Sequence, residues 1–240
     1  MKRLIALLAA ITLGTSAFAE KNWINLFNGK NLDGWVVKVA GSKAGENPGN
    51  IFRVEDGCLT VSYDAFDSFE GRFGHIFIDR PFTNYHFRCE YRFTGTQTPG
   101  GPGWAYANSG AMLQGQSPAS MGIKQDFPNS IEFQFLAQNA SGTRPTGSIC
   151  TPGTYVDING ETTKNHVINS SCIALPIGEW VKAEAIVTDG KIQHLINGKV
   201  VMECTNPCFD DGTPVTSGYI SLQAESHPCQ FRNIEIKTLD

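Results

Sequence analysis

The sequence predicts an all-β fold, and three observations favour it over folds built from long helices. Short segments alternate between apolar and polar residues, as strands with one buried face do. Two-residue turn dipeptides join several of these segments. No apolar pattern with a period of 3.6 residues is sustained along the chain. Many short strands joined by tight turns are typical of an antiparallel sandwich or barrel.

The turn dipeptides predict three hairpins, because Asn and Asp tolerate positive φ and Gly adopts it freely. Asp56-Gly57 separates strands predicted over 51–54 and 58–63. Asp189-Gly190 separates 181–188 from 191–196, Asn197-Gly198 then leads into 200–204, and Asn159-Gly160 is a weaker signal of the same kind. The other predicted strands span 75–78, 85–93, 110–114, 131–136, 218–223 and 230–237.

The first 19 residues have the pattern of a secretory signal peptide. Lys2 and Arg3 precede the apolar residues 4–13, and Ala17-Phe18-Ala19 matches a cleavage site. The apolar run is too short to remain as a membrane anchor. We therefore expect residues 1–19 to be removed, residues 20–240 to form a single domain, and the protein to be periplasmic or secreted.

The charge of the chain argues against binding to nucleic acid. The net charge is −4 and the basic residues form no stripe, so nucleic acid is not an expected partner.

Seven cysteines in an exported chain allow disulfides, and an odd number leaves at least one thiol free. Cys150 with Cys172, or Cys204 with Cys208, could close a loop. Cys58 and Cys89 lie within strand patterns and are expected to be buried free thiols.

The segment 130–136 carries the first candidate catalytic residue. Ile131, Phe133 and Phe135 should point to one face of a strand, and Glu132 and Gln134 to the other. A carboxylate beside an amide suits the binding and attack of a polyol such as a sugar. The alternative is a solvated outer face of a sheet. Long Gly/Pro-rich or polar loops over 95–109 and 137–171 flank this strand and are expected to place further chemistry beside Glu132.

The segment 223–227 is the second candidate region, since Gln223 and Glu225 should share a face and His227 should lie at the end of the strand. Such a group suits an acid/base pair or a divalent metal held by Glu and His, and the alternative is a polar edge leading into a turn. The remaining candidates lie on loops or strand ends: His166 as a contact or proton-transfer residue, Trp104 for stacking on a sugar, and Arg144 for binding hydroxyls or a carbonyl oxygen.

Five segments in register resemble one known family, the 3-keto-disaccharide hydrolase domain, formerly domain of unknown function 1080. They are Leu26-Phe27-Asn28-Gly29-Lys30-Asn31-Leu32-Asp33-Gly34-Trp35, Asn108-Ser109-Gly110-Ala111-Met112-Leu113, Ile131-Glu132-Phe133-Gln134, His194-Leu195-Ile196-Asn197-Gly198, and Gly218-Tyr219-Ile220-Ser221-Leu222-Gln223 running into Phe231-Arg232-Asn233-Ile234-Glu235-Ile236.

The resemblance implies a concanavalin-A-like jelly-roll β-sandwich of two antiparallel sheets, with a sugar cleft on the concave face. It also implies action on glycosides that carry a ketone at carbon 3. Asn108 and Gln114 lie in or beside the second matching segment and are expected to contact substrate, although some relatives carry histidine where this chain has Gln114.

The leading functional hypothesis is therefore an exported enzyme that cleaves 3-keto-glycosides with Glu132 as base. His166 and His227 are second-rank catalytic candidates, and Gln134, Gln223 and Glu225 are candidates for acid, enolate stabilisation or substrate contact. A non-catalytic carbohydrate-binding module remains an alternative, since one fold serves many functions. An ordinary glycoside hydrolase that uses Glu132 and Glu225 is a third reading.

Overall fold

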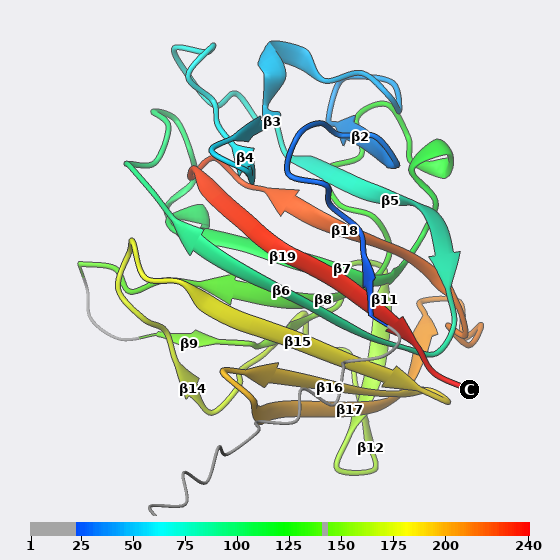
Figure 1. Ribbon diagram of the computed structural model, residues 1–240. Coiled ribbons are helices and arrows are strands. Elements are labelled where there is room, and N and C mark those ends of the chain that lie inside the picture. The colour runs from blue at the N-terminus through cyan, green and yellow to red at the C-terminus, as the bar shows by residue number, and fades with distance from the viewer. Residues whose placement is uncertain (1–22, 141–143) are drawn as a thin grey trace, which may run out of the picture.

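The computed structural model describes residues 23–140 and 144–240, so the predicted signal peptide lies outside the described residues. Two antiparallel sheets face each other, as Figure 1 shows, and the described residues contain no α-helix. The strands are β1 (Ile24–Asn25), β2 (Trp35–Val39), β3 (Phe52–Glu55), β4 (Cys58–Val61), β5 (Gly74–Phe82), β6 (Tyr85–Phe93), β7 (Asn108–Gly115), β8 (Ile131–Leu136), β9 (Pro145–Thr146), β10 (Ile149–Cys150), β11 (Thr154–Ile158), β12 (Glu161–Thr163), β13 (Val167–Ile168), β14 (Cys172–Ile173), β15 (Val181–Thr188), β16 (Lys191–Ile196), β17 (Lys199–Phe209), β18 (Gly218–Ala224) and β19 (Cys229–Thr238).

The smaller of the two main sheets carries the candidate site. Its strand order is β13-β10-β8-β7-β18-β5-β2, and the facing ten-stranded sheet runs β12-β11-β17-β16-β15-β6-β19-β4-β3, with β1 paired to β19. A separate pair joins β9 to β14. Three short 3-10 turns complete the described elements: η1 (Pro48–Asn50), η2 (Gly103–Ala105) and η3 (Pro118–Ser120).

The core lies between the two sheets and follows the predicted alternation. On β8, Ile131, Phe133 and Phe135 are fully buried in the core. The ring of Phe135 stacks on Tyr91 of β6, with 4.3 Å between the ring centroids. Burial of these large side chains anchors β8 and leaves Glu132 and Gln134 on the opposite face.

The predicted hairpins are confirmed, and Asp56, Asp189, Asn197 and Asn159 all have positive φ. The prediction of one long loop over 137–171 was wrong. Short strands β9 to β13 occupy much of it, and β10 pairs with β8. Their two- to five-residue length left too little alternation for the sequence to reveal them.

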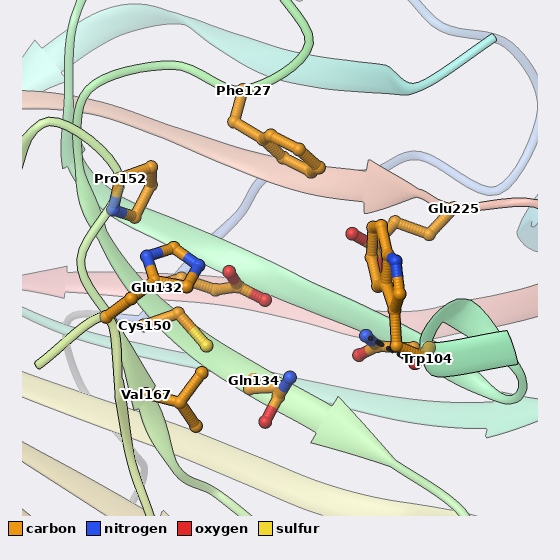
Figure 2. A pocket seen from close by; sticks show the side chains of 10 residues that line it. Trp104, Phe127, Glu132, Gln134, Cys150, Pro152, Val167 and Glu225 are labelled. Carbon is orange, nitrogen blue, oxygen red and sulfur yellow. Dashed lines mark hydrogen bonds between the residues drawn. The ribbon is translucent and has the colours of Figure 1, made fainter. Parts of the chain in front are cut away.

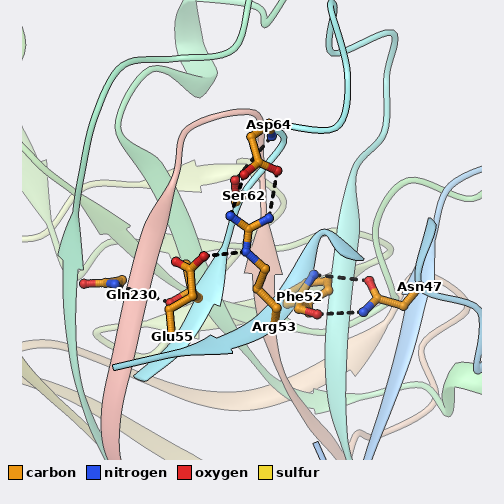
Figure 3. Close-up of polar contacts among 8 residues, drawn as sticks. Asn47, Phe52, Arg53, Glu55, Ser62, Asp64 and Gln230 are labelled. Atoms are coloured by element: carbon orange, nitrogen blue, oxygen red, sulfur yellow. Dashed lines mark hydrogen bonds and ion pairs between the residues drawn. The ribbon is translucent and has the colours of Figure 1, made fainter. Parts of the chain in front are cut away.

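The edge formed by β3 and β4 is held by polar contacts (Figure 3). Arg53 donates to both carboxylate oxygens of Asp64 at 2.7 and 2.6 Å, and to Glu55 at 2.7 Å. The Asn47 side chain donates to the Phe52 carbonyl and accepts from its amide. The ion pairs of Arg53 are partly exposed to solvent, so they contribute little to stability.

All seven cysteines are free. Cys58 and Cys89 are buried thiols on strands, as predicted. Among the described residues, no helix is both long enough and apolar enough to cross a membrane.

Candidate active site

A cavity of about 340 Å³ lies on the outer face of the seven-stranded sheet, over β8 and β7 (Figure 2). Glu132 and Gln134 project into it from β8, and Asn108 does so from β7. Its other lining residues are Trp104, Phe127, Cys150, Pro152, His166, Val167 and Glu225. Both predicted loop regions therefore contribute to the walls around Glu132.

Glu132 is buried although it lies on the outer face of the sheet, with 6% of its surface exposed. Its side chain lies over Gly110 of β7, where an added Cβ would be 2.8 Å from the Glu132 Oε1. Glycine at position 110 therefore provides the space in which the carboxyl group sits. A glutamate surrounded by solvent, the alternative considered above, does not fit this burial.

Burial sets the protonation of Glu132. Removal from water raises the pKa of its carboxyl group to about 8, against an ordinary value of 4.5. A hydrogen bond from the Cys150 thiol opposes this increase, because it stabilises the ionised form. Cys150 is the cross-strand neighbour of Glu132 on β10, and burial raises the pKa of its thiol, which keeps the thiol protonated as a donor.

Glu225 places a second buried carboxyl group in the same cavity. It follows directly after β18 and is 3% exposed. Burial raises the pKa of Glu225 well above its ordinary value, and the charge of Glu132 raises it further. Arg144 acts in the opposite direction with a smaller effect. Once Glu132 is ionised, its charge therefore helps to keep Glu225 protonated, an arrangement that suits one base and one acid in the same site.

The remaining polar groups of the cavity can bind hydroxyl or carbonyl oxygens. Asn108 donates its Nδ2 to the Trp104 carbonyl at 3.3 Å, and its Oδ1 has no partner. The amide of Gln134 opens onto the cavity from the row next to Glu132. His166 is exposed and lines the rim.

The aromatic wall is formed by Trp104 and Phe127, which both pack against the ring of Phe73. Trp104 stacks parallel to Phe73 with 5.7 Å between centroids and remains 56% exposed. Phe127 packs on the same Phe73 ring at 5.0 Å. An exposed, rigidly supported aromatic face suits stacking against a sugar ring.

His227 and Gln223 do not line the cavity. The sequence predicted that Gln223 would share a face with Glu225 and that His227 would lie at the strand end. Strand β18 ends at Ala224, however, and Ser226 has a φ of +74°, so His227 lies beyond the strand. His227 lies fully buried between the rings of Phe93 and Tyr106, and burial lowers its pKa to about 4. Gln223 is fully buried further along the sheet.

Gln114 and Arg144 also lie outside the cavity. The pairing between β7 and β18 shifts register beyond Met112, and Gln114 has a φ of +52°. As a result, the Gln114 amide donates to the Thr83 carbonyl at the far end of the sheet. Arg144 donates to the carbonyls of Tyr106, Ala107 and Ala137. It therefore holds the backbone that leads from Trp104 into Asn108, rather than reaching into the cavity itself.

Sequence reasoning did not single out Cys150, Phe127, Pro152 or Val167 as cavity residues. The contact of Cys150 with Glu132 depends on the register between β10 and β8, which the sequence pattern does not specify. Within residues 23–140 and 144–240, no group of three or more His, Cys, Asp or Glu side chains is placed to hold a metal ion.

The space at Gly110 yields a testable prediction. In Gly110→Ala the new methyl group would lie 2.8 Å from the Glu132 Oε1 and 3.0 Å from the Phe133 carbonyl oxygen, so the carboxyl group must move. We expect turnover to fall about 10- to 100-fold, as displacement of a catalytic group by about 1 Å does. Gly103→Ala is the matched control, because open space surrounds that position. Equal activity of the two variants would contradict the placement of Glu132.

Comparisons with known proteins identify the fold and the family. A proposed glycosyl hydrolase from Parabacteroides distasonis matches with a TM-score of 0.58 and 21% identity, over 91% of this chain and 94% of that chain. The carbohydrate-binding module CBM66 of Bacillus subtilis matches with a TM-score of 0.54 and 9% identity, over 85% and 96%. The β-glucanase of Bacillus licheniformis matches with a TM-score of 0.52 and 12% identity, over 92% and 100%.

At these identities the structural matches show the fold, which confirms the predicted jelly-roll sandwich. A search of curated proteins found no match. The family model described as a 3-keto-alpha-glucoside-1,2-lyase-like domain matches residues 22–237, which is almost the whole chain. The expected family is thereby confirmed, and this chain belongs to the family of 3-keto-alpha-glucoside-1,2-lyase-like domains.

Proposed function

We propose that this protein is a carbohydrate-active enzyme that cleaves 3-keto-glycosides by elimination, with Glu132 as the base. The observation that supports this most strongly is the buried Glu132 carboxyl group, with its pKa raised to about 8, on the floor of a cavity that also holds Glu225. Family membership and structural relatives among carbohydrate-active proteins support the same class of substrate.

Elimination from a 3-keto-sugar requires one strong base, which removes the proton on carbon 2. A ketone at carbon 3 makes the proton on carbon 2 acidic, so a carboxylate can remove it. A carboxylate whose conjugate acid has a pKa of about 8 is a stronger base than an ordinary glutamate. The electron pair moves onto the oxygen of carbon 3, and the resulting enolate needs a hydrogen-bond donor. The Gln134 amide, beside Glu132 on β8, is the donor that we assign to this oxygen.

Elimination is completed when the bond from carbon 1 to the leaving oxygen breaks. Glu225, which retains its proton when Glu132 is ionised, donates that proton to the leaving oxygen. The products are an alcohol and a sugar with a double bond between carbons 1 and 2. Addition of water across that bond gives net hydrolysis. Exchange with solvent returns both carboxyl groups to their starting states.

An ordinary two-carboxylate glycoside hydrolase is the second candidate, because Glu132 and Glu225 share one cavity. A retaining hydrolase needs one of the pair ionised as a nucleophile at neutral pH. Burial raises the pKa of both carboxyl groups, which disfavours that role. A binding module has no need of a carboxyl group with such a shifted pKa, so the enzyme reading is preferred.

A substrate panel tests the proposal. Wild-type protein is incubated with 4-nitrophenyl α-glucoside, with its 3-keto derivative, and with no enzyme as control for spontaneous cleavage. We expect turnover of the keto substrate alone. Turnover of the unoxidised glucoside would support the two-carboxylate hydrolase instead, and binding without turnover of either would support a carbohydrate-binding module.

The pH dependence follows from the pKa of Glu132. Only its ionised form is a base, so kcat/KM should rise about tenfold per pH unit and level off near pH 8. Cys150→Ala removes a hydrogen bond that favours ionisation of Glu132, so the midpoint of this variant's pH profile should move to higher pH. The measurement is kcat/KM between pH 5 and 9.5. A profile that is flat from pH 6 to 9 would contradict the assignment.

The predicted signal peptide supports a further part of the proposal, that the enzyme acts in the periplasm or outside the cell.

A further inference from the structure

A row of polar side chains crosses the outer face of the sheet beyond the cavity. Gln134 of β8 pairs with Gly110 of β7. On the next strand, Leu222 of β18 pairs with Ala111 of β7, so continuing this antiparallel register brings Gln223 beside Gly110. Gln223 pairs with His75 of β5, which pairs with Lys38 of β2. Directly opposed residues share a face of a sheet, so the row starts on the cavity floor and continues toward β2.

The two central members of the row are buried without partners. Gln223 and His75 are fully buried. The amide oxygen and nitrogen of Gln223 and both ring nitrogens of His75 have no hydrogen-bond partner. Burying a polar atom without a partner destabilises a fold, so a fold that keeps four such atoms together requires an explanation. The neighbouring Lys38, by contrast, donates to the carbonyls of Val39 and Ile123.

The chemistry of these atoms matches hydroxyl groups. Burial, assisted by the charge of Lys38, lowers the pKa of His75 to about 3, so its ring is neutral, with one nitrogen as donor and one as acceptor. The Gln223 amide also offers both. Hydroxyls donate and accept at once, whereas a carboxylate or a metal ion would satisfy only one kind of atom. A sugar ring is therefore the matching ligand.

Phe127 separates this pair from the cavity. Its ring meets that of His75 edge-on, with 6.0 Å between centroids, while it also lines the cavity. Figure 2 shows Phe127 on the side of the cavity away from Gln134. Phe127 is only partly buried. Rotation of this one ring would join the polar pair to the cavity and would offer an aromatic face to a ligand.

We propose that Gln223 and His75 form a second sugar subsite, which binds the sugar that leaves when the glycosidic bond breaks, with Phe127 as its movable cover. This inference rests on the proposed function. The leaving side is assigned because Glu225, the proton donor to the leaving oxygen, follows Gln223 by two residues at the end of β18. The departing group therefore extends over β18 and β5, where the unpaired atoms lie.

The test compares two leaving groups in Gln223→Leu: the sugar of 3-keto-maltose, oxidised in its non-reducing ring, and the 4-nitrophenol of 4-nitrophenyl 3-keto-α-glucoside. Loss of one or two hydrogen bonds should lower kcat/KM for the disaccharide about 10- to 100-fold, mainly through KM. The nitrophenyl substrate has no hydroxyl on its leaving group, so its kcat/KM should change less than about twofold on the same reasoning. Gln223→Met is the second variant, and Gln193→Leu on β16 of the other sheet is the control.

The outcomes separate the two proposals. A selective loss on the disaccharide supports the subsite. An equal loss on both substrates, or no loss on either, overturns it and leaves the proposed function standing. Failure of the wild-type protein to cleave either keto substrate overturns both. Gln223→Leu and Gln223→Met should melt at a temperature no lower than wild type, because each removes an amide that has no partner in the free protein. Melting at lower temperature would contradict the unpaired state.

Discussion

Glu132→Gln is expected to abolish cleavage of 3-keto-glycosides, with a fall in kcat of about 10²- to 10⁴-fold, the range that general-base catalysis contributes. The amide keeps the size and position of the side chain on β8 and removes only its basicity. The measurement is the initial rate of release of 4-nitrophenol from the keto substrate at pH 8.5, where about half or more of the wild-type Glu132 is ionised. A rate within a factor of about three of wild type would contradict a role as base.

The stability of the same variant is its control. The folded protein holds a proton on Glu132 between the ordinary pKa of 4.5 and the raised pKa of about 8, while the unfolded chain has released it. The contribution of Glu132 to stability is therefore most favourable below pH 4.5, falls as the pH rises, and levels off above pH 8. Glu132→Gln lacks this loss, so it should be more stable than wild type at pH 9, by a few kcal/mol since one pKa unit is about 1.4 kcal/mol.

Glu225→Gln is expected to have the second largest effect, and that effect should depend on the leaving group. A sugar alkoxide leaves poorly without a proton, so cleavage of a 3-keto-disaccharide should fall about 10²- to 10³-fold. 4-Nitrophenolate is a stable anion and needs little assistance. Its release should fall far less, and the ratio of the two rates measures the role of Glu225 as acid.

Equal losses with the two leaving groups would contradict proton donation by Glu225 and would favour a role in positioning substrate. Asn108→Ala serves as comparison, because its unpaired Oδ1 can only accept a hydrogen bond. We expect Asn108→Ala to weaken the binding of both substrates to the same extent.

Local pattern was sufficient to predict the framework and the first candidate catalytic residue. The alternation of 131–136 separates core residues from Glu132 and Gln134, and the turn dipeptides locate the hairpins. These features depend only on the period of a strand and on the backbone preferences of Gly, Asn and Asp. The family resemblance rested on several such segments in order, and it extended the prediction to the whole sandwich.

Local pattern was insufficient wherever a single residue interrupts it. The positive φ of Ser226 directs the His227 side chain into an aromatic pocket, against the ring of Tyr106. The irregular pairing beyond Met112 places Gln114 away from the cavity. The pairing of Cys150 with Glu132, and the space above Gly110, depend on the register of distant strands. Such register is fixed by packing of the whole sheet, so one sequence does not reveal it.

The most direct test of Glu132 as the base is exchange of the carbon 2 proton. Wild-type protein and Glu132→Gln are each mixed with a 3-keto-glucoside in D₂O, and deuterium at carbon 2 is followed by NMR beside an enzyme-free sample. The proposed elimination predicts that wild type removes the original carbon 2 proton and that deuterium enters carbon 2 when D₂O adds across the double bond. With Glu132→Gln we expect only the enzyme-free level of exchange. Cleavage by wild type that leaves the original proton on carbon 2 would contradict it.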